Sequence, residues 1–149
     1  MSDVKGTPLF ATAAFRLGTV GTVVADRFAG RIAEHDLKPK HVGLLAALTT
    51  APVASQLDLA RLMGVAPSLL VRLADHLEDL GAVERVRDPG DRRRQALRLT
   101  DRGHDLLATC AEISRSLDRE LLAGLSGAER AALRTGLGAV AGNLDLPFD

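Results

Sequence analysis

Apolar residues recur at helical spacing along most of the chain. Between residues 9 and 34 they fall at positions 9, 10, 13, 14, 17, 20, 24, 28 and 32, which together form one stripe of an amphipathic helix. Glycines and β-branched residues weaken this helix, so packing against other elements has to hold it. A second helix is predicted from Pro39 to Leu48, because proline favours the first helical turn. Residues 49–54 then form a connector.

The next stretch predicts two short helices joined by a tight turn. Ser55 is a typical N-cap for a helix over 56–63, which Gly64 ends. Pro67 begins a second helix, 67–80, in which leucines recur every three or four residues. This is the outline of a helix-turn-helix, whose second helix can enter a DNA major groove about 12 Å wide. Many helical hairpins share the outline, so it is weak evidence by itself.

A β-hairpin with an arginine-rich turn is predicted after these helices. Two short extended segments, 83–87 and 96–100, enclose a loop that contains a Pro-Gly pair followed by Arg92, Arg93 and Arg94. A cationic hairpin directly after a helix-turn-helix outline favours binding of nucleic acid. The alternative is a solvated hairpin with surface arginines, and the position of the loop disfavours it.

Two further helices are predicted at the C-terminal end. Thr100 caps a long helix over 101–124, and a capping box formed by Ser126 and Glu129 starts a last helix that runs to about Asn143. The tail after this helix contains a proline and cannot continue it. The whole pattern predicts a mainly α fold with a small β-hairpin.

The composition favours helices and argues against several classes of protein. The 149 residues include 26 leucines and 23 alanines, and only 3% are aromatic, which nearly excludes single-stranded nucleic-acid binding on stacked aromatic side chains. Cys110 is the single cysteine. Neither a disulfide within the chain nor a cysteine-based zinc site is therefore expected, and a reducing, cytoplasmic location is the default. No apolar run approaches the roughly 20 residues that cross a bilayer, so no membrane association is expected.

Positive charge gathers around the predicted hairpin. Nineteen Lys and Arg balance nineteen Asp and Glu, and a net charge of zero argues against a globally cationic nucleic-acid-binding protein. Residues 85–98, however, hold six arginines against two aspartates, a local charge of +4. Sixteen of the 19 basic residues are arginine, the side chain suited to phosphate forks and to a narrow minor groove.

Several motifs follow one another in a fixed order between Leu37 and Leu107. They are residues 57–65 (LDLARLMGV), 77–85 (LEDLGAVER), 88–94 (DPGDRRR) and 99–103 (LTDRG). Each stretch alone is common, but the combination of Leu-x-x-Leu-Gly, Asp-x-Arg and Leu-Thr-x-x-Gly is specific. In this order the motifs resemble the winged helix-turn-helix core of the MarR family of bacterial transcriptional regulators.

The resemblance implies a homodimer that binds a palindromic DNA operator. Residues 1–36 are then an N-terminal dimerisation helix. Residues 37–100 are the winged helix-turn-helix core, with its recognition helix at 67–80 and its wing at 83–100, and residues 101–149 complete the dimerisation region. A dimer is also physically reasonable, because the first and last helices carry more apolar surface than a small winged core can cover. No cofactor is implied.

The face of helix 67–80 opposite its leucines is the predicted DNA-reading surface. It carries Ser68, Leu69, Arg72, Asp75, His76 and Asp79, with Pro67 at its start. Arg72 is the main predicted base reader, because arginine bonded bidentately to guanine is the commonest specific contact. Ser68 is predicted to reach a phosphate or a base. His76 either contacts a phosphate when protonated or is a solvated surface residue.

The recognition helix departs from the pattern of the family at three positions. The family usually has Ser or Thr where this chain has Ala66, Leu69 and Val71. Loss of a polar N-cap at Ala66 should destabilise the helix by roughly 1 kcal/mol. An exposed Leu69 would contact thymine methyl groups instead of making hydrogen bonds.

In the wing, the resemblance assigns Asp91 to orient Arg93, which enters the minor groove. A carboxylate two residues away can hold a long cationic side chain and reduce the entropy lost on insertion. Arg92 and Arg94 are predicted to contact phosphates, as is Ser55 at the N-terminus of its helix.

Members of the family commonly respond to small phenolic or other lipophilic anions, which bind where the dimer helices meet the winged domain. The predicted lining residues are Phe15, Arg16, His41, Leu45 and Cys110. Core packing is the favoured alternative for Phe15, Leu45 and Cys110. His41 stands where the family often has glutamine, and it is either a polar anchor or a helix cap.

Other classes of protein are less well supported. The four histidines lack His-x-x-x-His spacing, and neither a Gly-x-Ser-x-Gly motif nor a phosphate-binding glycine loop is present, so an enzyme is not predicted. Metal sensing by Glu34, His35 and Asp36 is a minority alternative, because adjacent residues on a helix do not face one site. A winged-helix module that binds only proteins is the third class, and the cationic hairpin argues against it.

Overall fold

The computed structural model describes residues 8–146. The parts of the predicted N-terminal region and C-terminal tail at 1–7 and 147–149 lie outside the described residues. The chain divides into two units, one that ends at Ser114 and one that begins at Arg115. The division into dimerisation and DNA-binding regions at residues 36 and 100 stays a prediction.

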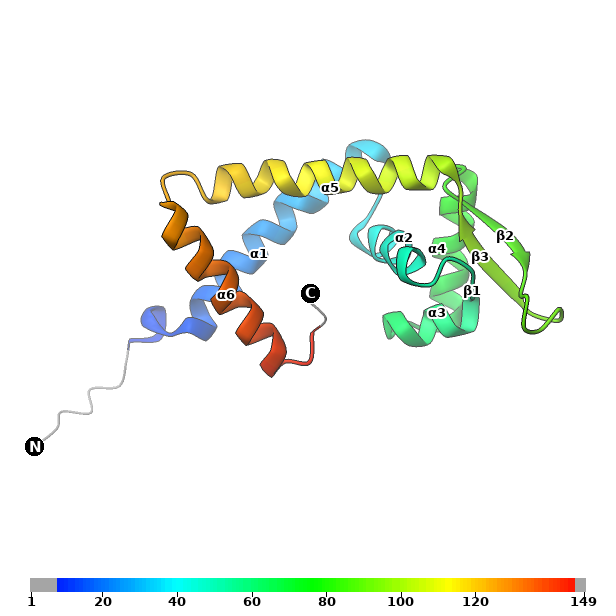
Figure 1. Ribbon diagram of the computed structural model, residues 1–149, viewed down its shortest axis with the longest axis horizontal. Coiled ribbons are helices and arrows are strands. Elements are labelled where there is room, and N and C mark those ends of the chain that lie inside the picture. The colour runs from blue at the N-terminus through cyan, green and yellow to red at the C-terminus, as the bar shows by residue number, and fades with distance from the viewer. Residues whose placement is uncertain (1–7, 147–149) are drawn as a thin grey trace, which may run out of the picture. The chain divides into compact units, whose positions relative to one another are not determined.

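The helices occur in the predicted order (Figure 1). They are the 3₁₀ helices η1 (Leu9–Ala11) and η2 (Ala33–His35) and the α-helices α1 (Ala13–Ile32), α2 (Pro39–Thr50), α3 (Gln56–Met63), α4 (Pro67–Asp79), α5 (Asp101–Leu121) and α6 (Gly127–Asn143). The strands are β1 (Ala54–Ser55), β2 (Val83–Arg87) and β3 (Gln95–Leu99).

The predicted first helix, 9–34, is divided into three pieces. Thr12 has extended backbone angles, and its side chain accepts a hydrogen bond from the N–H of Phe15 at 3.2 Å, so α1 begins after it. At the other end, Asp36 adopts a left-handed conformation with φ of 59°, which ends η2 before α2 begins. A pattern of apolar residues does not predict these helix ends, because the ends depend on polar side chains and backbone conformation.

The boundaries of the helix-turn-helix follow its capping residues as predicted. The Ser55 hydroxyl accepts a hydrogen bond from the N–H of Asp58 at 3.1 Å, and Gly64 ends α3 with φ of 63°. The start of α4 has no side-chain cap at Ala66, and Pro67 occupies the first turn.

The predicted hairpin is part of a three-stranded antiparallel sheet in the order β1-β3-β2. Strand β1 was expected to be connector, because two residues are too short to show any alternation. It pairs Ala54 with Leu97 and Ser55 with Ala96. Strand β3 ends at Leu99 rather than at the predicted residue 100, because Thr100 accepts a hydrogen bond from the N–H of Gly103 at 3.1 Å and caps α5.

The core of the first unit is built mainly from leucines. The helices α2, α3 and α4 and the sheet pack against one another in this unit. The largest fully buried side chains are Ile32, Leu37, Leu44, Leu45, Leu48, Leu59, Leu70, Leu77, Val83 and Leu97. Close packing of this kind fixes α4 on the sheet, with one face buried and the opposite face exposed.

The second unit contains the end of α5 and α6. Helix α5 ends at Leu121, three residues before the predicted end, because the chain turns there and Gly124 takes a φ of 83°. The capping box of α6 is confirmed: Ser126 Oγ accepts from the N–H of Glu129, and the Glu129 carboxylate accepts from the N–H of Ser126, both at 3.1 Å. Across residues 8–146, no helix is both long and apolar enough to span a membrane.

The first turn of α5 lies directly against the loop that precedes β2. The N–H of Thr100 donates to the carbonyl oxygen of Ala82 at 3.1 Å, and a Cβ atom placed on Gly103 would lie 2.0 Å from that same oxygen. Only glycine permits this approach, which gives the Leu-Thr-x-x-Gly motif a physical basis.

Gly103→Ala is expected to lower the free energy of unfolding by more than about 2 kcal/mol, because the backbone at Ala82 has to move. Gly43→Ala is the matched control, since its Cβ would meet only the end of Met63 at 3.5 Å. The control should be neutral or stabilise by about 0.5–1 kcal/mol. Denaturation followed by circular dichroism at equal protein concentration measures both. Equal stabilities of the two variants would contradict the close approach.

Candidate nucleic-acid interface

The exposed face of α4 is narrower than its sequence predicts. Leu70, Leu73, Ala74 and Leu77 are buried, as their spacing requires. The exposed residues among the first nine of α4 are Pro67, Ser68, Val71, Arg72 and Asp75. They stand at positions i, i+1, i+4, i+5 and i+8 and therefore share one side of the helix.

Leu69 and Val71 differ in exposure from what the leucine spacing suggests. Leu69 is half-buried and packs against the core, and its predicted DNA contact stays a prediction. Val71 is 40% exposed. The apolar side chain that α4 presents to solvent is therefore the valine.

His76 does not project freely from α4, and its predicted contact with a phosphate stays a prediction. Its Nε2 atom lies 2.6 Å from the backbone oxygen of Asp36, and its ring stacks on His41 with 4.4 Å between the centroids. The side chain joins the recognition helix to the segment between η2 and α2. Its Nε2 atom is thereby engaged within the protein.

His41 is a helix cap, one of its two predicted alternatives. The residue is 7% exposed, and its Nδ1 atom accepts a hydrogen bond from the N–H of Lys38 at 2.9 Å, which closes a capping box at the start of α2. Burial lowers the pKa of His41, and the nearby His76 and Lys38 lower it further, against a smaller opposing effect of Asp36. These effects favour the neutral form of the ring.

Arg85 connects the wing to both helices of the helix-turn-helix. Its side chain is 18% exposed and donates from Nε to Gln56 at 3.1 Å, from one terminal nitrogen to Glu78 at 2.8 Å and from the other to Asp75 at 2.6 Å. Gln56 begins α3, and the two acidic residues belong to α4. Charge-assisted hydrogen bonds to three side chains hold β2 and α4 in a defined relation.

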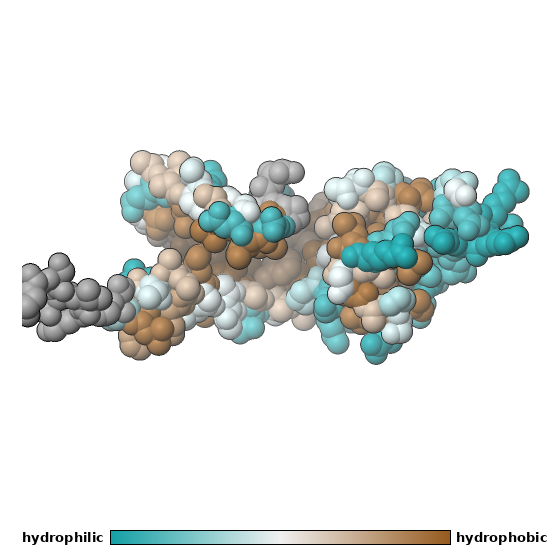
Figure 2. Space-filling model, turned by 90° about the horizontal axis from the view of Figure 1, so that it is seen from below, coloured by the Kyte–Doolittle hydropathy of each residue, from teal (hydrophilic) through white to brown (hydrophobic). Residues whose placement is uncertain are grey.

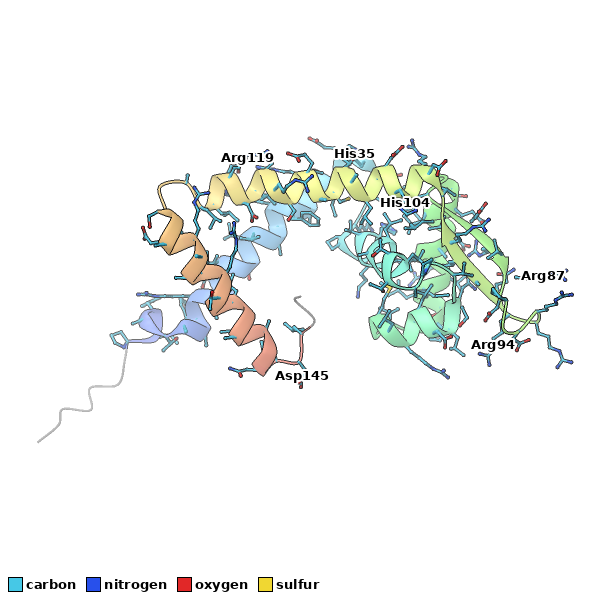
Figure 3. The ribbon with its side chains drawn as sticks, viewed as in Figure 1. His35, Arg87, Arg94, His104, Arg119 and Asp145 are labelled. Carbon is cyan, nitrogen blue, oxygen red and sulfur yellow. The ribbon has the colours of Figure 1, made fainter. Side chains whose placement is uncertain are left out.

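The positive charge of the hairpin is concentrated near its turn. Arg98 is paired with Glu84 on the neighbouring strand, and Arg85 is paired with α4. The remaining four of the six arginines lie in or beside the turn and are exposed: Arg87, Arg92, Arg93 and Arg94. Figure 3 shows Arg87 and Arg94 at this end of the hairpin, and Figure 2 shows it as a hydrophilic projection.

Asp91 organises the turn in a different way from the one expected. Its carboxylate accepts a hydrogen bond from the backbone N–H of Arg93 at 3.0 Å and lies 3.6 Å from Nε of Arg94. Within residues 8–146, no ion pair joins Asp91 to the guanidinium of Arg93. Asp91 thus fixes the backbone that carries Arg93, while the Arg93 side chain extends from the turn.

Ser55 is also corrected as a phosphate contact. It is 3% exposed, and its hydroxyl is engaged with the N–H of Asp58. A buried hydroxyl that caps α3 cannot reach a DNA backbone without opening the start of the helix.

The five predicted effector residues do not form one cavity. Leu45 and Cys110 belong to the core, where burial raises the pKa of the Cys110 thiol. Phe15 packs edge-to-face on Phe10 with 5.1 Å between centroids, and Arg16 donates from Nε to the Phe10 carbonyl at 2.8 Å. The core interpretation of Leu45 and Cys110 is confirmed.

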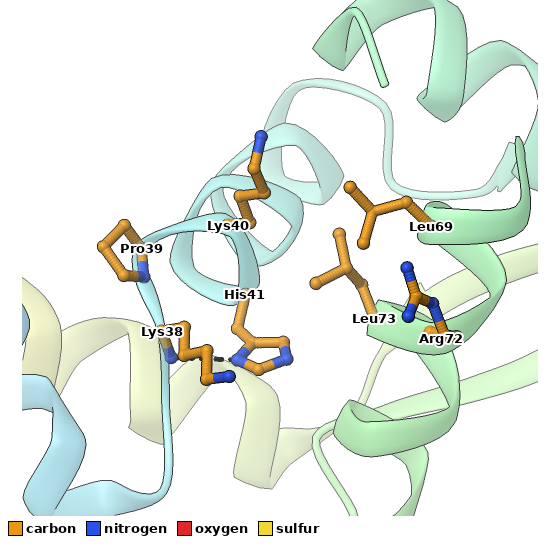
Figure 4. A pocket seen from close by; sticks show the side chains of 7 residues that line it. All are labelled: Lys38, Pro39, Lys40, His41, Leu69, Arg72 and Leu73. Atoms are coloured by element: carbon orange, nitrogen blue, oxygen red, sulfur yellow. Dashed lines mark hydrogen bonds between the residues drawn. The ribbon is translucent and has the colours of Figure 1, made fainter. Parts of the chain in front are cut away.

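His41 is the one member of the set that lines a cavity between α2 and α4. This cavity has a volume of about 460 Å³, and Figure 4 shows the side chains around it: Lys38, Pro39, Lys40, His41, Leu69, Arg72 and Leu73. Lys38 and Lys40 were not predicted as site residues. The signal that could have found them is the pair of lysines that flanks the helix-starting Pro39.

The metal-sensing alternative gains no support from the side chains. Across residues 8–146, no group of three or more His, Cys, Asp or Glu side chains is placed to hold a metal ion. Asp36 instead contacts His76 through its backbone oxygen.

Known proteins resemble the chain in sequence. A model of the MarR family matches residues 35–94. A putative transcriptional regulatory protein for the hcr operon from Thauera aromatica is 36% identical over 95 residues, which cover 64% of this chain and 57% of that protein. The transcriptional regulator HosA from Escherichia coli O111:H- is 32% identical over 95 residues, which cover 64% of this chain and 70% of HosA.

Solved structures share the fold over most of the chain. The apo form of wild-type MarR from E. coli matches with a TM-score of 0.77 and 23% identity, over 87% of this chain and 96% of that one. The transcriptional repressor CouR, bound to a 23-mer DNA duplex, matches with a TM-score of 0.74 and 28% identity, over 94% of this chain and 99% of that one.

The fold is that of a winged helix-turn-helix protein, which confirms the predicted fold class. The chain belongs to the MarR family, because it is 32% identical to HosA over 70% of that protein; the family model agrees, and it covers the helix-turn-helix and the first strand and turn of the hairpin. Members of this family are transcriptional regulators and not enzymes, as the sequence predicts.

His41→Gln is expected to reduce the dependence of stability on pH between about pH 7.5 and pH 5. In the unfolded chain His41 has the ordinary histidine pKa of about 6.5, whereas in the folded protein its pKa is lower. Near and below pH 6.5 the unfolded chain therefore binds more protons than the folded protein does. The free energy of unfolding therefore falls as the pH drops through 6.5 towards the folded pKa. Glutamine suits this position of a capping box, so the variant keeps the cap and removes the titration.

Denaturation curves at several pH values measure this difference, and His104→Gln, at an exposed position of α5, is the control. The control should follow the wild-type protein. A loss of stability on acidification that is as steep in His41→Gln as in the wild type would contradict a neutral, buried His41.

Proposed function

We propose that the protein binds a palindromic DNA operator as a homodimer and regulates transcription, most simply as a repressor. The observation that carries this proposal is a pair of exposed features in one unit: the face of α4 with Ser68 and Arg72, and the arginine-rich turn of a hairpin whose strand β2 is tied to the same helix by Arg85. Arginine in the major groove reads guanine, and arginine in the minor groove reads groove width and phosphate charge.

In this arrangement Arg72 is the main base reader, and Ser68 contacts a base or a phosphate. Arg93 enters the minor groove, while Arg92 and Arg94 contact phosphates on either side. The hydrogen bond from the backbone N–H of Arg93 to the Asp91 carboxylate supports this role, because it reduces the freedom of the turn before DNA is bound. The match to CouR, a repressor seen with a DNA duplex, is consistent with the same use of the fold.

The dimer is supported by apolar side chains that each unit leaves exposed. In α1 these include Leu17, Val20 and Val23, and in α6 they include Leu133, Leu137 and Val140. Such surfaces are typical of interfaces between subunits. A cytoplasmic location belongs to the same proposal, because chromosomal DNA is the partner.

We further propose that a small anionic effector binds the cavity between α2 and α4. Lys38, Lys40 and Arg72 offer positive charge, and Leu69 and Leu73 offer an apolar wall. The volume of about 460 Å³ lies within the range of small-molecule sites. A lipophilic carboxylate there would engage Arg72, the predicted base reader, and so compete with DNA.

Arg93→Ala is expected to weaken binding to a duplex obtained by in vitro selection by at least about tenfold. The slope of log affinity against log salt should fall by about one unit for each lost phosphate contact. Fluorescence anisotropy at several salt concentrations measures both, and light scattering checks that the variant stays dimeric. Arg134→Ala, which removes the same charge from an exposed position of α6, is the control. Unchanged affinity and slope in Arg93→Ala would exclude a DNA contact by this wing residue.

Salicylate, a phenolic carboxylate, is expected to weaken duplex binding by the wild-type protein and to act less on Lys40→Ala. Benzyl alcohol, which is aromatic but uncharged, is the matched probe and should have little effect. The same anisotropy assay measures both. The effector site is refuted if the two compounds act alike or if Lys40→Ala responds as the wild type does.

A further inference from the structure

Val71 is an apolar side chain exposed in the middle of a polar helix face. It is 40% exposed. On the surface of α4 its neighbours three residues before, one residue after and four residues after are Ser68, Arg72 and Asp75, which are also exposed. A docking surface for another protein would need a continuous apolar patch, and these polar neighbours separate Val71 from any such patch on this face.

The position of Val71 on the helix is that of a residue that reaches bases. It lies one turn after Pro67, the first residue of α4, and adjacent to Arg72, so it occupies the N-terminal half that enters a major groove. Adjacent residues on a helix diverge by about 100°, so Val71 and Arg72 face neighbouring base pairs.

Asp75, one turn after Val71, is not free to contact a base in its place. Asp75 accepts a hydrogen bond from Arg85 at 2.6 Å, and Glu78 accepts one from the same guanidinium at 2.8 Å. In the major groove a carboxylate usually accepts a hydrogen bond from the amino group of cytosine, and a carboxylate that is paired with Arg85 is not available for it. Val71 is therefore left as the group that faces this part of the groove.

We infer that Val71 is a specificity-determining residue that contacts the C5-methyl group of a thymine, next to the base pair read by Arg72. The methyl group is the apolar feature of the major groove, and it distinguishes thymine from cytosine and from uracil. Cytosine at this position would place an amino donor against the valine, with no acceptor to pair with it. The inference rests on the proposed binding of DNA. Beyond it, the inference names thymine as the base that Val71 selects.

In vitro selection with the full-length protein, from a random duplex of about 30 base pairs, is the first measurement. The wild-type protein should enrich thymine at one position in each half-site, and Val71→Ala should lose that enrichment while still enriching the neighbouring guanine. Val71→Ala is expected to fold, because the side chain is exposed and alanine is the better helix former.

Replacement of that thymine by deoxyuridine then tests the methyl group itself, since it changes nothing else in the duplex. In anisotropy titrations the wild-type protein should lose about threefold to fourfold in affinity for each half-site changed, as expected for one buried methyl group. Val71→Ala should be insensitive to the replacement. Val53→Ala is the matched control: Val53 is 38% exposed and lies outside the recognition helix, so this variant should respond as the wild type does.

Two results would overturn the inference while leaving DNA binding in place: selection without an enriched thymine beside the guanine, or equal sensitivity of wild type and Val71→Ala to deoxyuridine. A selection in which no sequence is enriched, together with no salt-dependent duplex binding, would instead refute the proposed function and the inference with it.

Discussion

The side chain of Arg85 donates hydrogen bonds in three directions, and the arrangement of the DNA-facing elements depends on them. It stands on β2, yet its partners are Gln56 at the start of α3 and Asp75 and Glu78 on α4. A strand, a helix start and the recognition helix are thereby held by one planar group. Because a guanidinium presents its donors in a rigid fork, a lysine could not replace these contacts in geometry or in number.

The recognition helix is held on its opposite side by His76. There the partners are the backbone of Asp36, in the connection between η2 and α2, and the ring of His41, in the first turn of α2. The leucines of α4 pack on the core beneath it. Polar links on two sides and apolar packing on a third leave one face free, and a helix held in this way loses little entropy when it enters a groove.

Much of the fold could be predicted from the sequence, because the relevant signals are local. Ser55, Gly64 and Ser126 act through their own backbone neighbourhood, so the helix ends that they mark were predicted correctly. The two-residue strand β1 could not be predicted in this way, because it exists only through pairing with Ala96 and Leu97, some forty residues later. The winged helix-turn-helix itself followed from the order of the motifs.

The candidate site was predicted less completely, because side-chain partners are set by tertiary structure. Helical spacing placed His76 and Leu69 on an exposed face, but α2 and the core lie against that side of the helix. Counting six arginines in the hairpin gives each of them the same weight in the local charge. In the structure, however, Arg85 and Arg98 have carboxylate partners on other elements. Only the contacts separate arginines that hold the fold from arginines that are free for a ligand.

The pairing of charges within the hairpin has a kinetic consequence. The chain as a whole is neutral, Arg98 is paired with Glu84 on the neighbouring strand, and Arg85 is paired with α4, so the positive charge of the hairpin is concentrated in the few arginines near its turn. At physiological ionic strength the field of that charge is screened within about 8 Å. Long-range steering towards DNA by the hairpin is therefore expected to be weak. The residence time on DNA then depends on the contacts made after encounter, those of α4 and those of the turn together.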